Sequence, residues 1–164
     1  MLITITPATA EPVTLEEAKA HLRVDHDADD GLISSLITAA REAVELFTGR
    51  ALAAATYRLA SEDCGPYLLP IWPASVSLVS SVVNGSRIDA ESFEFDSDRS
   101  LVFGYFGSAV RVEFATEPGP VPESLKAAIK LRIEALYDAS PDEKQTLIQA
   151  ADALAHPFRM NMGV

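Results

Sequence analysis

The sequence predicts an α+β fold that is mainly helical, with about four helices and a small antiparallel β-sheet or hairpin region in the middle of the chain. Two observations lead to this class. Apolar residues recur with the 3.6-residue period of a helix before residue 50 and after residue 122. Between these stretches the period changes to two, and Asn84-Gly85 is the strongest short hairpin signal.

A length of 164 residues fits one domain, and the composition is typical of a globular protein. We therefore expect a single domain over residues 1–164. Its expected parts are a helical segment at 14–49, a β-rich segment at 55–115, a second helical segment at 122–155 and a flexible C-terminal tail at 156–164.

A capping box predicts where the first helix begins. The Thr14 hydroxyl can accept a hydrogen bond from the Glu17 amide, while the Glu17 carboxylate reaches back to the amide of Thr14. A short helix should follow this pair and end near Arg23, before the acidic run at 25–30.

The second helix is the most strongly patterned element of the chain. Asp29 or Asp30 can cap it, because a carboxylate accepts from free amides at a helix N-terminus. The helix should run to Thr48, where Gly49 suits the left-handed closing position. Its apolar positions are Leu32, Ile33, Leu36, Ile37, Ala40, Ala43, Val44 and Phe47.

The middle of the chain predicts strands of one small antiparallel sheet. Runs rich in β-formers lie at 55–61, 76–83, 93–95, 101–103 and 110–114. The proline-punctuated segment at 67–73 should form an edge strand or a polyproline strip, because proline cannot donate a ladder hydrogen bond. The arm before residue 14 is expected to be extended.

Two further helices should complete the chain. The proline-rich segment at 118–122 breaks the sheet and presets a helix that ends near Asp138. Ser140 and Glu143 form a second capping box, with Pro141 at the first helical position. This fourth helix should stop ahead of Pro157.

The charge balance limits the possible partners. A formal net charge of −11 disfavours a protein that clasps DNA, because phosphates repel it. The stretch 121–164 is close to neutral and is the better candidate for docking onto another protein. Cys64 is the only cysteine, and no stretch of about 18 apolar residues occurs, so a cytoplasmic protein without a membrane segment is expected.

The acidic run resembles part of a calcium loop, since Asp25, Asp27 and Asp29 alternate. The motif is incomplete, because Asp30 stands where glycine makes the turn and Leu36 stands where a bidentate glutamate is needed. A solvated helix cap is the favoured interpretation, and no metal site is expected.

Catalytic chemistry finds little support in the residue pattern. His21, His26 and His156 are scattered, and the acidic neighbours of Cys64 would raise the pKa of its thiol. Nucleotide-binding and hydrolase motifs are absent from the sequence. We therefore predict no catalytic residue, no cofactor and no enzyme activity.

Basic and aromatic side chains are the residues that a nucleic-acid site would need. Lys126, Lys130 and Arg132 lie close together on the third helix, but a solvated face in which Lys130 pairs with Glu134 is favoured. The aromatic residues Trp72, Tyr67, Tyr105 and Phe106 are expected in the sheet core instead of a base-stacking platform.

Several blocks together resemble the head-tail connector (adaptor) proteins of tailed phages, prophages and gene transfer agents. The most distinctive block is Val-Thr-Leu-Glu-Glu-Ala at 13–18 with its continuation to residue 50, and Leu-Ala-His-Pro-Phe-Arg at 154–159 is similar to the C-terminal signature of that family. The segments at 69–73, 79–82 and 122–129 also resemble it.

The resemblance implies a structural subunit without catalysis. Such a subunit forms a homo-oligomeric ring, commonly of twelve copies, that docks under the portal protein and receives a head-completion (stopper) or tail-proximal protein. DNA passes through the central channel without sequence-specific binding. The protein would be cytoplasmic during assembly and then part of the virion or phage-like particle.

The C-terminal tail is the predicted portal-binding segment. It is short, apolar in part and without a helix pattern of its own, and its candidate residues are His156, Pro157, Phe158, Arg159, Met160 and Met162. We expect it to be mobile in the free subunit and ordered against the portal.

Two other functions stay open at this point. A small intracellular enzyme or ligand-binding α+β domain would need a deep cleft lined by convergent polar groups such as Asp25 and His26. A DNA-binding regulator would have to overcome the acidic balance.

Overall fold

The computed structural model describes residues 1–62, 65–104 and 108–160. These residues form two compact units. Residues 1–10 and 53–118 belong to a sheet unit, and residues 11–52 and 119–160 belong to a helical unit. Each unit is therefore built from two separate stretches of the chain, and the α+β class predicted from the sequence is confirmed.

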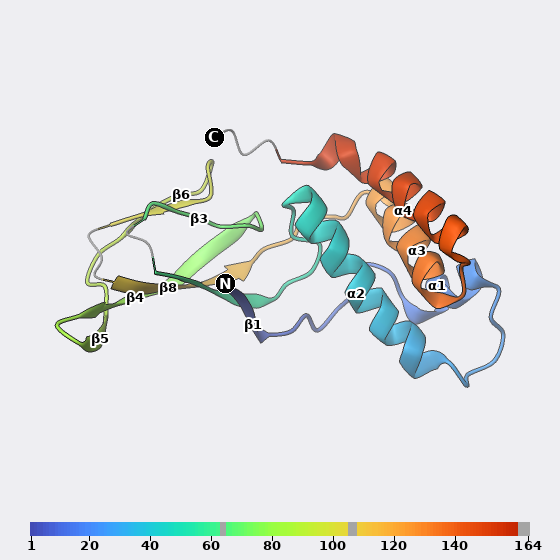
Figure 1. The fold of residues 1–164 in the computed structure, drawn as a ribbon, viewed down its shortest axis with the longest axis horizontal. Coiled ribbons are helices and arrows are strands. Elements are labelled where there is room, and N and C mark those ends of the chain that lie inside the picture. Colours follow the sequence, from blue (N-terminus) through green and yellow to red (C-terminus); the bar gives the residue numbers. More distant parts are fainter. Residues whose placement is uncertain (63–64, 105–107, 161–164) are drawn as a thin grey trace. The chain divides into compact units, whose positions relative to one another are not determined.

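Four α-helices and one short 3₁₀-helix form the described part of the helical unit (Figure 1). They are α1 (Leu15–Leu22), α2 (Asp30–Thr48), α3 (Glu123–Tyr137), α4 (Pro141–Ala155) and η1 (His156–Phe158). Figure 1 shows α3 and α4 side by side, as expected for helices joined by a short turn.

The predicted capping boxes are confirmed. The Thr14 amide donates to Glu17 Oε2 at 2.9 Å, and the Glu17 amide donates to Thr14 Oγ1 at 3.2 Å. At α4, the amide and hydroxyl of Ser140 donate to Glu143 Oε2 at 3.1 and 2.6 Å. Gly49 closes α2 with φ 72°, a left-handed conformation that glycine adopts without strain.

The carboxylate cap expected for α2 is wrong. Asp29 is the N-cap residue, but its side chain makes no capping hydrogen bond and accepts from the Tyr137 hydroxyl at 2.6 Å. The Asp30 carboxylate accepts from Lys19 Nζ at 2.7 Å. Both groups take partners from other helices, which were not visible in the local sequence.

The core of the helical unit lies where all four helices meet. Ile33, Ile37, Ala40 and Val44 of α2 pack with apolar residues of α1, α3 and α4. Those partners are Ala18, Leu125, Ala128, Ile129, Ile133, Ala151 and Ala155. Leu32, which the period assigned to the same stripe, is 52% exposed and lies outside the core.

Two antiparallel sheets form the sheet unit. The five-stranded sheet has the order β1-β2-β8-β4-β5, from β1 (Leu2–Thr6), β2 (Thr56–Ser61), β8 (Ser108–Thr116), β4 (Ala74–Val83) and β5 (Ser86–Asp89). The three-stranded sheet has the order β3-β7-β6, from β3 (Tyr67–Leu68), β7 (Leu101–Phe103) and β6 (Glu94–Asp96). Figure 1 shows β3 and β6 on one side of the larger sheet.

The expectation of a single sheet is therefore wrong in its pairing, although most strands lie near their predicted positions. The Asn84-Gly85 turn joins β4 to β5 as predicted, with φ values of 51° and 79°. The extended arm pairs with β2 as an edge strand. The proline-punctuated strip contributes β3, an edge of the smaller sheet.

One face of the larger sheet contributes to the apolar core of this unit. Val110, Val112 and Phe114 alternate along β8 and are buried. The Phe114 ring packs against the ring of Tyr57 on β2, with 5.6 Å between centroids. Tyr67 and Val102 of the smaller sheet are also buried, so Tyr67 is a core residue as predicted. Trp72 is only partly buried, and its Nε1 donates to the Ser97 carbonyl at 2.7 Å. Tyr105 and Phe106 lie outside the described residues.

Candidate assembly surfaces

A buried ionic cluster on α2 binds both ends of the chain segment at which the chain enters and leaves the helical unit. Arg41 on α2 is only 2% exposed, and its Nε donates to Glu11 Oε2 at 2.8 Å. Its Nη1 donates to Glu45, which is 1% exposed. Glu45 Oε1 accepts from the Leu52 amide at 2.7 Å. Glu11 and Leu52 are the first and last residues of the first stretch of this unit. Side chains of α2 therefore hold both ends of that stretch.

In the sheet unit, a cluster of uncharged hydrogen bonds links the beginning and the end of the second stretch of the chain. The buried Thr116 hydroxyl donates to the Ala53 carbonyl and accepts from the Ala55 amide, both at 2.9 Å. The Thr116 amide donates to the Ala55 carbonyl at 2.9 Å. Residues 53–55 begin the second stretch of the unit and Thr116 lies near its end, so one side chain ties the two together.

The first part of the predicted portal-binding tail packs on the helical unit. Residues 156–158 form η1, and Phe158 is partly buried against the helical core. The Arg159 guanidinium lies 5.5 Å from the centre of the Phe47 ring, and the Met160 amide donates to the Thr48 carbonyl at 2.8 Å.

His156 and Pro157 are exposed, and Met162 lies outside the described residues. The structure thus places Arg159 and Met160 at the end of α2 and Phe158 against the helical core. The mobility expected of the free tail and its binding to a portal stay predictions.

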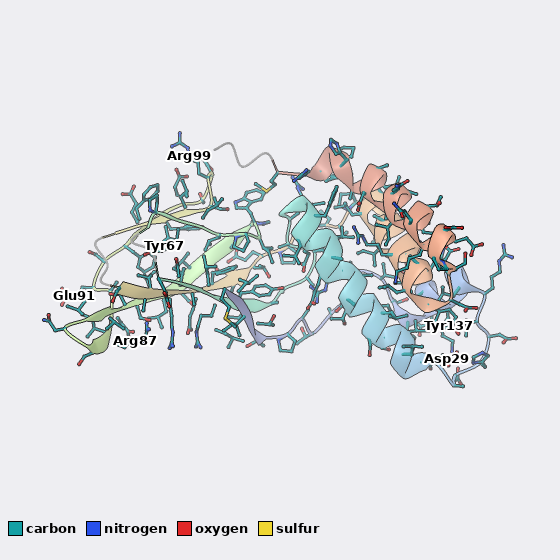
Figure 2. The ribbon with its side chains drawn as sticks, in the orientation of Figure 1. Asp29, Tyr67, Arg87, Glu91, Arg99 and Tyr137 are labelled. Atoms are coloured by element: carbon teal, nitrogen blue, oxygen red, sulfur yellow. The ribbon has the colours of Figure 1, made fainter. Side chains whose placement is uncertain are left out.

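The second face of the five-stranded sheet carries arginines from three strands. Strand register places Arg58, Arg111 and Arg87 on the same face, which we call the arginine face. Arg58 pairs with Glu113 at 2.6 Å, and Arg87 Nη2 donates to the Ala109 carbonyl at 3.0 Å. Figure 2 shows Arg87 on the side of the sheet away from Tyr67.

An open cavity of about 470 Å³ lies on the arginine face and is lined by Arg87 and Arg111. The other lining residues are Met1, Ala60, Ser61, Glu62, Ala109 and Val110. Glu62 is the one carboxylate among these residues, and Arg111 is exposed. Two arginines therefore line a hollow in a protein whose net charge is −11.

The helical unit carries an open cavity of opposite charge, which we call the acidic cavity. Its volume is about 920 Å³. Its four carboxylates come from Glu134, Asp138, Asp142 and Glu143, and its basic groups come from His21 and Arg23. His21 Nε2 lies 2.9 Å from Glu134 Oε2, whereas Asp138 and Asp142 are exposed.

The acidic cavity differs from the cleft that an enzyme would need. Asp25 and His26, the residues named for such a cleft, do not line it. The pairing expected between Lys130 and Glu134 is replaced by the contact of Glu134 with His21. The partly buried Arg132 on the same helix pairs with Asp152 of α4.

The acidic run at 25–30 makes contacts within the helical unit. Lys19 Nζ lies 2.7 Å from the carboxylates of both Asp27 and Asp30. Hydrogen bonds to these two groups raise the pKa of Lys19, and the Lys19 bond lowers the pKa of Asp27. The hydrogen bond to Asp29 raises the pKa of Tyr137.

Among residues 1–62, 65–104 and 108–160, no three His, Cys, Asp or Glu side chains are grouped closely enough to hold a metal ion. In the same part of the chain, none of the helices combines the length and apolar character needed to cross a bilayer. Cys64 lies outside the described residues.

Comparison with solved structures identifies the class of fold. The chain is similar to a chain in the virion of a native gene transfer agent (GTA) particle, with a TM-score of 0.71 and 22% identity over 98% of this chain and 95% of that one. It is also similar, at the same identity and coverage, to chains in the neck of an empty GTA particle computed with C6 symmetry and in the neck of a native particle computed with C12 symmetry. Their TM-scores are 0.68 and 0.64.

The sequence defines the family. Residues 12–155 match the family model of phage gp6-like head-tail connector proteins. The chain therefore belongs to this family and has a structural connector role, which confirms the resemblance inferred from the sequence. These matches speak against an enzyme. No curated protein matches the chain significantly.

Proposed function

We propose that the chain is the adaptor subunit of a head-tail connector, in which copies form a ring beneath the portal and receive the stopper or next tail-proximal protein. The family match over residues 12–155 carries this proposal. The similarity to neck chains in particles computed with C12 and C6 symmetry supports a ring, with twelve copies as the expected number.

In this proposal the two units act together as one subunit domain, and the protein moves from the cytoplasm into the finished particle. DNA passes through the channel without sequence-specific contacts. An acidic channel wall would keep the DNA from sticking, since the chain carries a net charge of −11. Mapping the charges that face the lumen of the assembled ring tests this point, and a predominantly basic wall would refute it.

The tail is the proposed portal-binding segment. In residues 156–160, Phe158 packs against the helical core, while Arg159 and Met160 contact the end of α2. An apolar side chain beside a guanidinium suits a protein interface, because arginine and large apolar residues are enriched there.

Mixing the purified chain with its portal and imaging the particles by electron microscopy tests the ring. A closed ring of copies on the portal is expected. A wild-type chain that stays monomeric on the grid and leaves the portal bare would overturn the proposal.

Two truncations separate the parts of the tail. Removing residues 157–164 should abolish portal binding, whereas removing 161–164 leaves Phe158, Arg159 and Met160 in place and measures what the last four residues add. Circular dichroism checks that both variants stay folded. Unchanged portal binding by the longer truncation would defeat the role of the tail.

A further inference from the structure

The sheet unit and the helical unit carry hollows of opposite charge. The arginine face has two guanidinium groups, Arg87 and Arg111, at a cavity of about 470 Å³. The acidic cavity, of about 920 Å³, has four carboxylates. Since His21 contacts Glu134 and Ser140 contacts Glu143, Asp138 and Asp142 are the carboxylates best placed to meet a cation from outside.

We propose that the arginine face of one copy docks on the acidic cavity of a neighbouring copy. This inference rests on the ring of the proposed function and assigns the surfaces that would join its subunits. A ring closes through a repeated head-to-tail contact, in which two different surfaces of the same chain meet. The two cavities meet this requirement, because they lie on different units and carry complementary charges.

A second copy suits the arginine face better than DNA does. Glu113 and Asp89 share the face with the three arginines, so a phosphate backbone would meet carboxylates as well as guanidinium groups. Nucleic-acid sites gain affinity from many uncompensated cations, whereas a protein interface gains specificity from mixed complementary charges.

The three arginines also differ in the contacts that their guanidinium groups make within the sheet unit. Arg58 is engaged by Glu113, and Arg87 bonds to the Ala109 carbonyl and, at 3.4 Å, to the Ser80 hydroxyl. These contacts hold their guanidinium groups close to the sheet. Arg111 is exposed at the centre of the face, on β8, and is the residue expected to reach a carboxylate of the neighbour.

A charge swap tests the contact directly. Arg111→Asp and Asp138→Arg are each expected to reduce ring formation on the portal by about tenfold, since each places like charges against one another. The double variant restores the opposite charges with their positions exchanged, and it should form rings as the wild type does. Ring occupancy is counted by electron microscopy and checked by native mass spectrometry.

Two exposed residues outside the proposed contact provide matched controls. Arg99→Asp makes the same charge change elsewhere on the sheet unit, where Figure 2 shows Arg99 on the opposite side from Arg87. Asp25→Arg does so in the acidic run of the helical unit, at an exposed residue that does not itself line the cavity. Both controls should assemble normally.

The outcomes separate this inference from the proposed function. Normal rings from both single variants, or a double variant that stays defective, would overturn the contact while leaving the connector role intact. A wild-type chain that forms no ring on the portal would overturn both. If Arg111→Asp assembles normally but loses DNA retention in filled particles, the face contacts nucleic acid and the inference is wrong.

Discussion

The two units solve the same structural problem with different chemistry. Each is made from separate stretches of chain that must be tied together. The helical unit ties its stretch with a buried arginine between glutamates, whereas the sheet unit uses the hydroxyl of Thr116. A buried charge cluster depends on every member, because removing one partner leaves the other uncompensated. A neutral hydrogen bond costs less to lose.

Arg41→Ala gives the largest effect expected from this comparison. The variant leaves Glu45 buried without its guanidinium partner, so the free energy of unfolding should fall by about 3–5 kcal/mol. Urea denaturation followed by circular dichroism measures it. Replacing Arg41 and Glu45 together by methionine removes both buried charges and should cost less, and the remaining loss is attributed to the Leu52 amide, which no longer has its acceptor. A loss below about 1 kcal/mol for Arg41→Ala, the range of an exposed pair, would contradict the buried cluster.

Thr116→Val tests the hydrogen bonds of the Thr116 hydroxyl in the sheet unit. Valine keeps the shape but leaves the Ala55 amide without the hydroxyl acceptor, which should cost about 1–3 kcal/mol. Amide hydrogen exchange should also accelerate at residues 53–55. Thr116→Ser retains the hydroxyl and serves as the control. If valine is tolerated as well as serine, the hydroxyl does not hold the junction.

Ser140→Ala probes a site far from both junctions in the sequence. The substitution removes a hydroxyl that binds Glu143 in the capping box, and a loss of about 1 kcal/mol is typical of such changes. Thermal denaturation measures it against Ser140→Thr. If Ser140→Ala lowers the free energy of unfolding as much as Arg41→Ala does, the clusters around Arg41 and Thr116 are not the contacts on which stability depends most.

The smallest expected effect concerns pH. Hydrogen bonds from Ser140 hold the pKa of Glu143 below its usual 4.5, so folding favours the ionised carboxylate. The resulting stability is present above the unfolded pKa and is lost as the pH falls through the folded value. The difference in melting temperature between Glu143→Gln and the wild type should therefore become smaller as the pH of the measurement is lowered from about 6 to about 3. A gap that stays constant would contradict this linkage.

Local signals in the sequence predicted the helices well and the sheets poorly. Thr14, Gly49 and Ser140 act within a few residues of themselves, so their roles can be seen in the sequence alone. Strand pairing joins distant segments, and nothing in the run at 67–73 distinguishes a second sheet from the edge of the first. Strand positions were therefore easier to predict than strand partners.

The candidate surfaces show the same limit. The family and the tail residues could be named from the sequence, but Arg41 and Glu45 have the spacing of an ordinary exposed ion pair. Only their burial distinguishes Arg41 and Glu45 from an exposed ion pair. The arginine face was missed because Arg58, Arg87 and Arg111 come from three strands that the fold brings together. The alternation of residues along β8 was the one available signal that Arg111 points away from the core.

The order of strands in the larger sheet has a consequence for synthesis. Its central strand, β8, is the last of the five to leave the ribosome. Until then β1 with β2, and β4 with β5, are separate two-stranded ribbons, which are marginally stable alone. A truncated chain that lacks β8 therefore cannot complete the five-stranded sheet, so the fold of this unit depends on synthesis having passed residue 116.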